Sequence, residues 1–350
     1  MKGFRVIKKP FFSSIQDEGR FGYEQFGVPN SGAIDPLSYK LGNLLLDNDI
    51  NAACIEIVQG SAEFLVTNNF WITITGGDLN PKINGVPVKM WQTIYVVSND
   101  ILTFSKPEKG FRSYVCVKNG VKIPSVMGSK STYYQLELGG KVLKEDDQIF
   151  INEGSQEYKF QYLKNIPNNL GLENAKIKVT KSSEYNLFSK EVLDMFFNSV
   201  FTVTSRMNRV GLVLDGPKIK TIDNNNDIVS SGTSKGVIQV PKDGMLYILI
   251  NDCQTSGGYP RIFSVCTSDF IYLAQLKPQD KIQFELISID ESLERLRSQN
   301  KLIDNNNIGF IDSNPSIELS YQNKNYNLTF GKINHKKQLS INGKPIKVEF

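Results

Sequence analysis

Short apolar runs, separated by polar and glycine-containing turns, recur along most of the chain. In the first half such runs occupy residues 64–66, 70–75, 94–97, 101–104, 113–117 and 133–138. The dipeptide Asn84-Gly85 lies between two further apolar runs, and this pair is typical of a two-residue β-hairpin turn. Similar runs return at residues 201–204, 236–240, 246–250, 262–265 and 281–287. Many short strands at close spacing predict a β-barrel or a β-sandwich.

A few segments carry helical signals instead. Asp35 is a predicted N-cap with Pro36 at the first helical position, and the leucines that follow fall on one helical face. Ser189 is a second predicted N-cap, in front of a helix with one apolar side. Residues 269–276 are expected to be helical up to a proline, and residues 291–299 are expected to form a polar helix. We therefore expect a mainly β protein with a few short helices.

Two features indicate that the chain contains two similar β-units. Residues 165–174 are rich in Asn, Pro, Gly and Leu and form the predicted linker. The segment Arg20-Phe21-Gly22-Tyr23 resembles Arg209-Val210-Gly211-Leu212, and each follows a strand-like start. We place the first β-unit at residues 1–165 and the second at residues 175–290. Residues 291–350 form a helix and a β-rich extension to which the sequence assigns no role.

The composition excludes some classes of partner. The 350 residues carry a net charge of +4 and no dense Lys/Arg cluster, which argues against a nucleic-acid partner. No apolar run is long enough to cross a bilayer, and we expect no membrane partner. The four cysteines have no C-x-x-C spacing and predict reduced thiols in the cytoplasm.

The chain contains one histidine, His335, in a polar segment near its C-terminus. A Ser-His-Asp or Cys-His system would have to use that residue, and a metal site built from histidines is nearly excluded. Any chemistry is therefore expected to use carboxylates, hydroxyls, amides, Arg or Lys side chains, and backbone N–H groups.

The most informative stretch is a polar corner between two strand-like runs, at residues 252–260. It reads Asp-Cys-Gln-Thr-Ser-Gly-Gly-Tyr-Pro. Two adjacent glycines permit positive φ and a close approach of the backbone to a ligand. A polar loop at the end of a buried strand is a common small-molecule site. A plain Gly-Gly-Tyr-Pro turn explains the same residues, so both interpretations stay open.

A second loop, residues 27–35, leads directly into the first predicted helix. The free backbone N–H groups at a helix N-terminus can hold an anion. Asp35 could itself occupy those donors as the N-cap, which would leave no room for an anion. The sequence allows either arrangement.

Six motifs, in this order, carry a resemblance to a known family. They occupy residues 16–22 (Gln-Asp-Glu-Gly-Arg-Phe-Gly), 27–35 (Gly-Val-Pro-Asn-Ser-Gly-Ala-Ile-Asp), 128–133 (Gly-Ser-Lys-Ser-Thr-Tyr), 208–211 (Asn-Arg-Val-Gly), 236–241 (Gly-Val-Ile-Gln-Val-Pro) and 254–260 (Gln-Thr-Ser-Gly-Gly-Tyr-Pro). Together they resemble the biotin-dependent carboxyltransferase-like family, also called allophanate hydrolase subunit 2. The resemblance covers about residues 3–290.

This family includes the C subunit of bacterial 5-oxoprolinase and an antagonist of a sporulation-kinase inhibitor. The resemblance implies two cyclophilin-like β-barrel units, in agreement with the strand-rich pattern. It also implies an ATP-dependent enzyme that opens 5-oxo-L-proline to L-glutamate in a complex with a B subunit, which is the homologue of the kinase inhibitor, and an A subunit. No segment matches a Walker-type phosphate loop or a biotin-attachment sequence. ATP is therefore expected to be bound by a partner subunit or shared with one.

The implied reaction indicates which residues could form the site. Opening a lactam requires positive groups near the transferring phosphoryl group and donors at a developing oxyanion. Arg20 and Arg209 are the predicted charges, and Asp17 and Asp252 are the predicted acid–base or substrate-orienting carboxylates. The predicted substrate-binding residues are Gln254, Thr255, Gly257, Gly258, Tyr259, Ser129, Ser131, Thr132, Gly32, Asp35 and Gln239.

Structural roles would explain several of these residues equally well. Arg20 and Arg209 could each hold a carboxylate within their own unit. Asp17 could cap the turn that follows it, and the hydroxyls between residues 129 and 132 could cap turns of their own.

The chain departs from the family pattern at three positions. Lys130, Val213 and Cys253 stand where the family usually has Arg. Lys130 keeps the positive charge but loses the bidentate geometry of a guanidinium. Val213 and Cys253 lose the charge, which affects the expected anion-binding geometry and leaves the expected fold intact.

Two other functions are compatible with the same residues. One is the carboxyltransferase component of a biotin-dependent urea or amide carboxylase, with biotin as the cofactor. The other is a non-catalytic regulatory protein that binds a partner of the kinase-inhibitor type.

Overall fold

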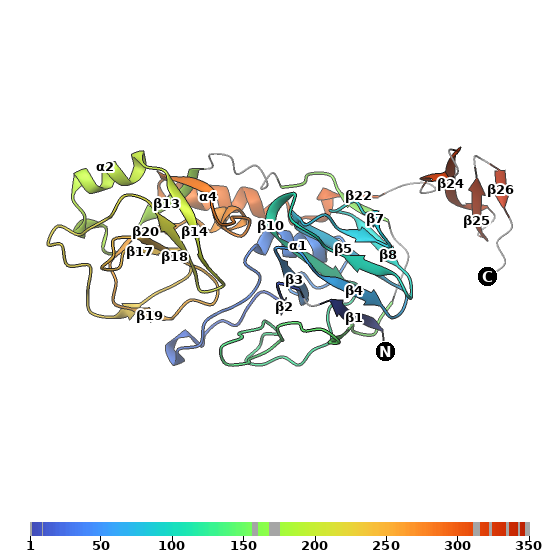
Figure 1. Ribbon diagram of the computed structural model, residues 1–350, viewed down its shortest axis with the longest axis horizontal. Coiled ribbons are helices and arrows are strands. Elements are labelled where there is room, and N and C mark those ends of the chain that lie inside the picture. The colour runs from blue at the N-terminus through green and yellow to red at the C-terminus, as the bar shows by residue number, and fades with distance from the viewer. Residues whose placement is uncertain are drawn as a thin grey trace.

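The computed structural model describes residues 2–8, 10–155, 160–167 and 176–310, and the backbone of residues 316–321, 324–333, 336–341 and 344–346. His335 and most of the predicted linker lie outside these residues. The described part is mainly β with a few short helices, as expected (Figure 1). The helices of the described part are α1 (Pro36–Leu44), α2 (Lys190–Asn198), α3 (Phe270–Leu273) and α4 (Ile289–Asn300), and the 3-10 turns are η1 (Glu24–Phe26), η2 (Tyr185–Leu187), η3 (Thr267–Asp269) and η4 (Asn305–Asn307).

The first half of the chain forms two sheets around one apolar core. One sheet has the order β11-β1-β4-β9-β6-β7 and the other the order β2-β3-β10-β5-β8. Phe4 and Phe64 from the first sheet meet Ile55, Ile72 and Val115 from the second in this core. The strands are β1 (Gly3–Lys8), β2 (Phe12–Gln16), β3 (Cys54–Val58), β4 (Glu63–Val66), β5 (Phe70–Asp78), β6 (Lys82–Ile83), β7 (Val86–Pro87), β8 (Thr93–Val96), β9 (Ile101–Thr103), β10 (Lys109–Val117) and β11 (Gln148–Phe150).

Helix α1 covers the outer face of the second sheet, which is why β5 and β10 are buried on both faces. The predicted cap is confirmed, because the Asp35 carboxylate accepts a hydrogen bond from the backbone N–H of Ser38 and Pro36 is the first helical residue. Thr73 and Thr75 of β5 donate to α1 carbonyls at 2.9 and 2.8 Å. The helix is thereby held against the sheet, and its N-terminus faces the second half of the chain.

The second half closes a barrel in the order β13-β20-β17-β18-β15-β14-β21. Its core is rich in aromatic side chains, and Phe196 of α2 stacks on Phe284 with 4.7 Å between the ring centres. The predicted cap of α2 is also present, since Ser189 Oγ accepts from the backbone N–H of Val192. The strands are β13 (Lys176–Lys181), β14 (Phe201–Met207), β15 (Gly211–Asp215), β17 (Val237–Gln239), β18 (Leu246–Leu249), β20 (Arg261–Val265) and β21 (Lys281–Leu286).

Smaller sheets complete the described structure. The pair β12 (Gln161–Leu163) and β22 (Ile308–Phe310) joins a segment after β11 to the segment after α4. The strands β23 (Ser316–Tyr321), β24 (Lys324–Ile333), β25 (Lys336–Ile341) and β26 (Lys344–Ile346) form a sheet of their own near the C-terminus (Figure 1). Among the described residues, no helix has the length and apolar character needed to cross a membrane.

Two local predictions have opposite outcomes. The Asn84-Gly85 hairpin is confirmed, because these residues have φ of 51° and 82° and connect β6 to β7. The strand expected at residues 133–138 is wrong. Tyr133 and Leu138 form an isolated bridge with each other around a turn, so the alternating apolar residues here belong to a loop.

Candidate functional site

The two units meet where the loop between β2 and α1 lies against the end of β18. Asn251 follows that strand, and its backbone carbonyl accepts from the N–H of Ser31 at 2.9 Å. Its side-chain amide donates to the carbonyls of Ser31, Gly32 and Ala33 at 3.0–3.2 Å. Gly32 has φ of 91°, and a Cβ at this position would lie 2.6 Å from the carbonyl oxygen of Glu18. Only glycine fits this close contact.

Arg209 lies at this contact and uses its guanidinium to connect both units. Its Nε donates to Asp252 at 3.0 Å, and its Nη1 donates to Glu56 of β3 at 2.5 Å. Its Nη2 donates to the carbonyl of Gly32 at 2.6 Å and to Asp252 at 3.2 Å. Burial alone would lower the pKa of Arg209, but the charges of Asp252 and Glu56 raise it above the ordinary value. Arg209 is therefore a fully paired cation that holds the units together.

Glu56 is a residue of the candidate site that the sequence reasoning missed. It is fully buried and accepts from Arg209, from the Tyr114 hydroxyl at 2.9 Å and from the backbone N–H of Ile34 at 3.1 Å. The available signal was a single acid within the otherwise apolar run Cys54–Val58. A charge inside a buried strand requires a partner.

Asp35 lies beside Glu56 and is completely buried. It accepts from Ser38 and from the side-chain amide of Gln275 of the second unit, at 3.3 Å. Burial raises the pKa of Asp35 to about 6, while the hydrogen bonds from Ser38 and Gln275 lower it and the charge of Glu56 raises it further. Because Asp35 occupies the α1 N-terminus, the anion site considered there is not formed.

Asp17 organises the loop at residues 128–133. Its carboxylate accepts from the Ser129 and Ser131 hydroxyls at 2.6 and 2.5 Å, from the Lys130 backbone N–H at 2.5 Å and from the Gly19 N–H at 2.9 Å. Thr132, also a predicted site residue, donates to a carbonyl of β2 at 2.9 Å. Asp17 thus caps its own turn, as the structural alternative proposed, and also fixes the loop above it.

Arg20 differs from Arg209 in how its guanidinium donors are used. It is 1% exposed, and its Nη2 donates to the carbonyl of Ser131 at 2.5 Å. Its Nε and Nη1 have no hydrogen-bond partner among the described residues. Burial lowers the pKa of Arg20, and the nearby charges of Asp17 and Asp252 oppose that shift. The site therefore contains a buried cation with unused donors, whose charge the Asp17 and Asp252 carboxylates favour.

Other buried polar atoms at the contact are also without partners in the described part of the chain. Ser31 Oγ and Asn251 Oδ1 belong to the segments that join the units. Gln239 Nε2 lies nearby in the second unit, where Gln239 accepts from Gln254 at 3.2 Å. Within the described ranges, no group of three or more His, Cys, Asp or Glu side chains could hold a metal ion. The unused groups suit a small polar or anionic ligand.

The predicted polar corner divides into two parts. Asp252 is buried and pairs with Arg209, whereas β19 (Ser256–Gly257) pairs with β16 (Ser231–Gly232) at the edge of the barrel. There Thr233 donates to the carbonyl of Gln254, and its N–H donates to the carbonyl of Thr255. Gly258 follows β19, and Tyr259 remains 39% exposed. The corner is thus a paired turn with its acid directed to the unit contact.

The three departures from the family pattern have separate environments. Cys253 packs with Val237 and Leu249, and burial raises the pKa of its thiol to about 11. Val213 is buried on β15, and Lys130 contributes its backbone N–H to Asp17. All four cysteines are free and buried.

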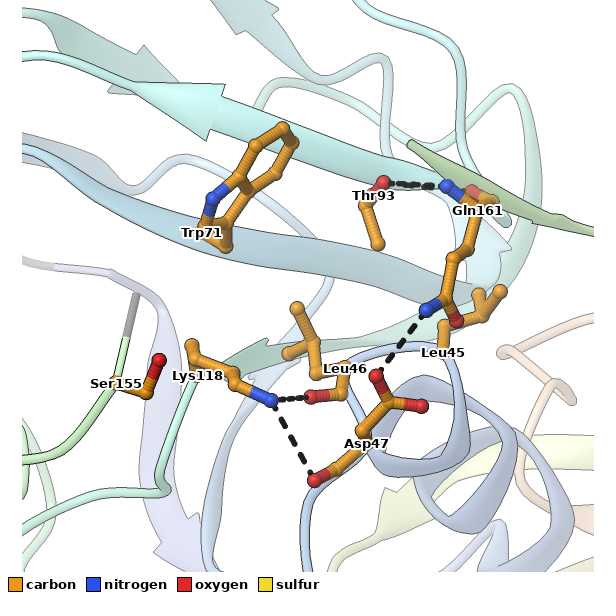
Figure 2. Close-up of a pocket in the computed structure, with 8 residues that line it drawn as sticks. All are labelled: Leu45, Leu46, Asp47, Trp71, Thr93, Lys118, Ser155 and Gln161. Atoms are coloured by element: carbon orange, nitrogen blue, oxygen red, sulfur yellow. Dashed lines mark hydrogen bonds between the residues drawn. The ribbon is translucent and has the colours of Figure 1, made fainter. Parts of the chain in front are cut away.

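A pocket of about 170 Å³ lies elsewhere, at the segment that follows the C-terminal end of α1. Figure 2 shows that its polar groups bind one another: Lys118 donates to the carbonyls of Leu46 and Asp47, and Gln161 donates to the Asp47 carboxylate at 3.2 Å. None of the predicted site residues lines this pocket. We therefore place the candidate site at the unit contact around Arg20.

Comparisons with known proteins agree with the motifs. The family described as "Carboxyltransferase domain, subdomain A and B" matches residues 26–286. The C subunit of 5-oxoprolinase from Escherichia coli (strain K12) is 31% identical over 301 residues, which cover 85% of this chain and 95% of that protein. The urea amidolyase of Saccharomyces cerevisiae is 28% identical over 324 residues, which cover 86% of this chain and 18% of that protein.

The fold comparison points to the same group of proteins. The crystal structure of the K. lactis urea amidolyase matches with a TM-score of 0.83 and 26% identity. The match covers 97% of this chain and 23% of that one. The chain is thus similar in length to the E. coli relative. It corresponds to about a quarter of the K. lactis urea amidolyase.

Proposed function

The chain belongs to the carboxyltransferase-domain family, as its motifs predicted, and we propose that it is the C subunit of a 5-oxoprolinase-type enzyme. The proposed complex, with A and B subunits, opens 5-oxo-L-proline to L-glutamate with consumption of ATP. The E. coli relative, itself named as the C subunit of 5-oxoprolinase, supports this choice because it is similar over 95% of its own length.

The observation that carries the proposal is the buried Arg20 with its unused Nε and Nη1. Lactam opening develops negative charge on the carbonyl oxygen, and preorganised donors in a dry site stabilise such a charge. Arg20 would bind this oxygen, and Asp17 and Asp252 would keep the guanidinium charged and oriented. Arg209 would act as a positioning residue, since all of its donor atoms bind protein groups.

ATP supplies the phosphoryl group that activates the lactam oxygen. The unused donors of this chain fit one small oxyanion, and no glycine-rich phosphate loop accompanies them. We therefore place the nucleotide on a partner subunit or at a site shared with one.

The test uses the tagged chain purified from its native cells together with the proteins that accompany it. The assay is release of phosphate from ATP that depends on 5-oxoproline. We expect Arg20→Met to lower kcat/KM by about 10²–10³-fold, as the loss of an oxyanion donor does. Arg20→Lys should retain part of the activity, and Arg5→Met is the matched control because Arg5 is exposed on β1. Full activity of Arg20→Met would contradict the proposal.

A second candidate function is carboxyl transfer from biotin to a urea-like amide. The fold similarity to the K. lactis urea amidolyase favours it, because a carboxylate is also an oxyanion that Arg20 could bind. Turnover that requires bicarbonate and stops with avidin would support this function. If neither assay showed turnover while a B-type partner stayed bound, the regulatory alternative would be supported.

A further inference from the structure

The pocket at the C-terminal end of α1 combines buried and charged lining residues. It measures about 170 Å³ (Figure 2). Leu46, Trp71 and Gln161 are buried, whereas Asp47 is exposed and Lys118 is half-buried. An apolar cavity of about 150 Å³ holds one benzene molecule, so this pocket has room for a ligand of about six to ten non-hydrogen atoms. A largely apolar pocket with a few convergent polar groups is typical of small-molecule sites.

Gln161 contributes a buried hydrogen-bond acceptor to this pocket. The residue is 2% exposed, and its Oε1 has no partner among the described residues. The other half of the same amide is used, because Nε2 donates to the Asp47 carboxylate at 3.2 Å. Since both amide atoms are bonded to one carbon, Oε1 lies next to that carboxylate. A buried acceptor without a donor is unfavourable, and a ligand with N–H groups would satisfy it.

Asp47 has an unusual conformation and charge for a residue just after a helix. Its φ of 47° lies in the left-handed region, where glycine or asparagine is usual at this position. A carboxylate near the C-terminal end of a helix also opposes the helix dipole. Local stability therefore favours asparagine or glycine over aspartate here, whereas a bound cation would use the negative charge.

Lys118 brings the opposite charge to the pocket. Figure 2 shows Lys118 and Gln161 approaching Asp47 from opposite sides. The Lys118 Nζ donates to the carbonyls of Leu46 and Asp47, and no carboxylate of the described residues pairs with it. An ammonium group has three N–H donors, so one remains for a ligand. A carboxylate placed here would neutralise the charge that the two carbonyls leave.

We propose that this pocket binds a small α-amino acid in its zwitterionic form. The ammonium group of the ligand would donate to the Asp47 carboxylate and to Gln161 Oε1, and its carboxylate would accept from Lys118 Nζ. Its side chain would lie against Trp71. A simple anion or a simple amine satisfies only one half of this arrangement. The pocket follows the C-terminal end of α1, whereas Asp35 and the candidate site lie at the N-terminal end, so the two sites are separate.

The direct test measures binding by the full-length chain without turnover. L-Alanine and L-glutamate are titrated by calorimetry at constant ionic strength, and we expect saturable binding of at least one of them. Propionate and ethylamine each carry one of the two charges of alanine and should bind at least about tenfold more weakly. The chain has two tryptophans, so Trp91→Phe leaves Trp71 as the only one. The fluorescence of this variant should change with the same affinity that calorimetry gives.

The variants assign the binding to this pocket. Asp47→Asn removes the charge and suits the left-handed conformation, so the helix end should stay intact. We expect this variant and Lys118→Met to raise the Kd by about tenfold or more, because each loses a charged hydrogen-bonding group. Asp49→Asn is the matched control, since Asp49 is exposed two residues further on and does not line the pocket. Unfolding midpoints of all variants verify that they are folded.

Three outcomes would overturn the proposal. One is the absence of saturable binding of either amino acid to the unchanged chain. Another is binding of propionate as tight as that of L-alanine, which would make the pocket a simple anion site. The third is an unchanged Kd in Asp47→Asn, which would place the ligand elsewhere. These titrations do not depend on the proposed function, because they are interpreted in the same way whether or not the complex turns over 5-oxoproline.

Discussion

Arg20 and Arg209 occupy similar motifs, yet the structure gives them different environments. Both are buried, at 1% and 3% exposure, and both are the first residue of an Arg-x-Gly element. Arg209 binds Asp252, Glu56 and Gly32, and each of its guanidinium nitrogens donates. Arg20 has one carbonyl partner and two nitrogens without any in the described structure.

This difference separates a structural arginine from one available to a ligand. Leaving a buried donor unpaired costs about 1–3 kcal/mol, and more for a charged group. Stability alone gives no reason to keep such donors at Arg20, whereas ligand binding does. The Arg-x-Gly motif thus predicts that its arginine is buried. Whether the guanidinium donors are bound by protein groups then indicates whether the arginine is structural or free to bind a ligand.

The largest loss of stability is expected from Arg209→Met, because this substitution removes the shared partner of two buried carboxylates. Asp252 and Glu56 would remain buried without their cation. Breaking a buried ion pair from one side costs about 3–5 kcal/mol. Urea unfolding of the full chain measures this loss, with Arg5→Met as the control. A midpoint equal to that of the control would show that Arg209 does not hold the units together.

The next effect on stability depends on pH and concerns Asp35, which is buried beside Glu56. The pKa of Asp35 rises from 3.8 to about 6, chiefly through burial. The folded state therefore keeps a proton between about pH 4 and pH 6 that the unfolded state loses, so stability falls as pH rises through this window. Relative to Asp35→Asn, the wild type should lose about 3 kcal/mol of unfolding free energy between pH 4 and pH 7. If the difference in unfolding free energy between the wild type and Asp35→Asn did not vary with pH, the raised pKa of Asp35 would be contradicted.

A smaller effect is expected from Asp17→Asn, which affects the loop beside Arg20. The amide would lose the charge that accepts from Ser129 and Ser131 and from the Lys130 N–H. Hydrogen bonds to a charged group contribute about 2 kcal/mol. Faster proteolytic cleavage within residues 128–133, together with a lower unfolding midpoint, is the expected result. Unchanged cleavage would mean that Asp17 does not hold this loop.

Much of the fold could be predicted because it depends on local patterns. The caps Asp35 and Ser189 and the hairpin turn at Asn84-Gly85 follow from residue chemistry within a few positions. The division into an open pair of sheets and a closed barrel could not be predicted, since it depends on which distant strands pair. The loop at residues 133–138 was mistaken for a strand because its apolar residues alternate without a partner strand.

The candidate site could be predicted only in part, because it depends on contacts between residues far apart in the sequence. The sequence identified Arg20, Arg209, Asp17 and Asp252, yet it could not tell paired donors from free ones. Glu56 and Asn251 act through contacts that span more than 150 residues of sequence.

The smallest stability effect is expected from Arg20→Met, and it tests the comparison most directly. The substitution removes one hydrogen bond to Ser131 and also removes two buried donors that have no partner in the described structure. These contributions oppose each other, so the unfolding free energy should change by no more than about 1 kcal/mol. A loss similar to that of Arg209→Met would show that Arg20 is structural after all. A small change in stability, combined with a large loss of turnover in the complex, would separate the two arginines by function.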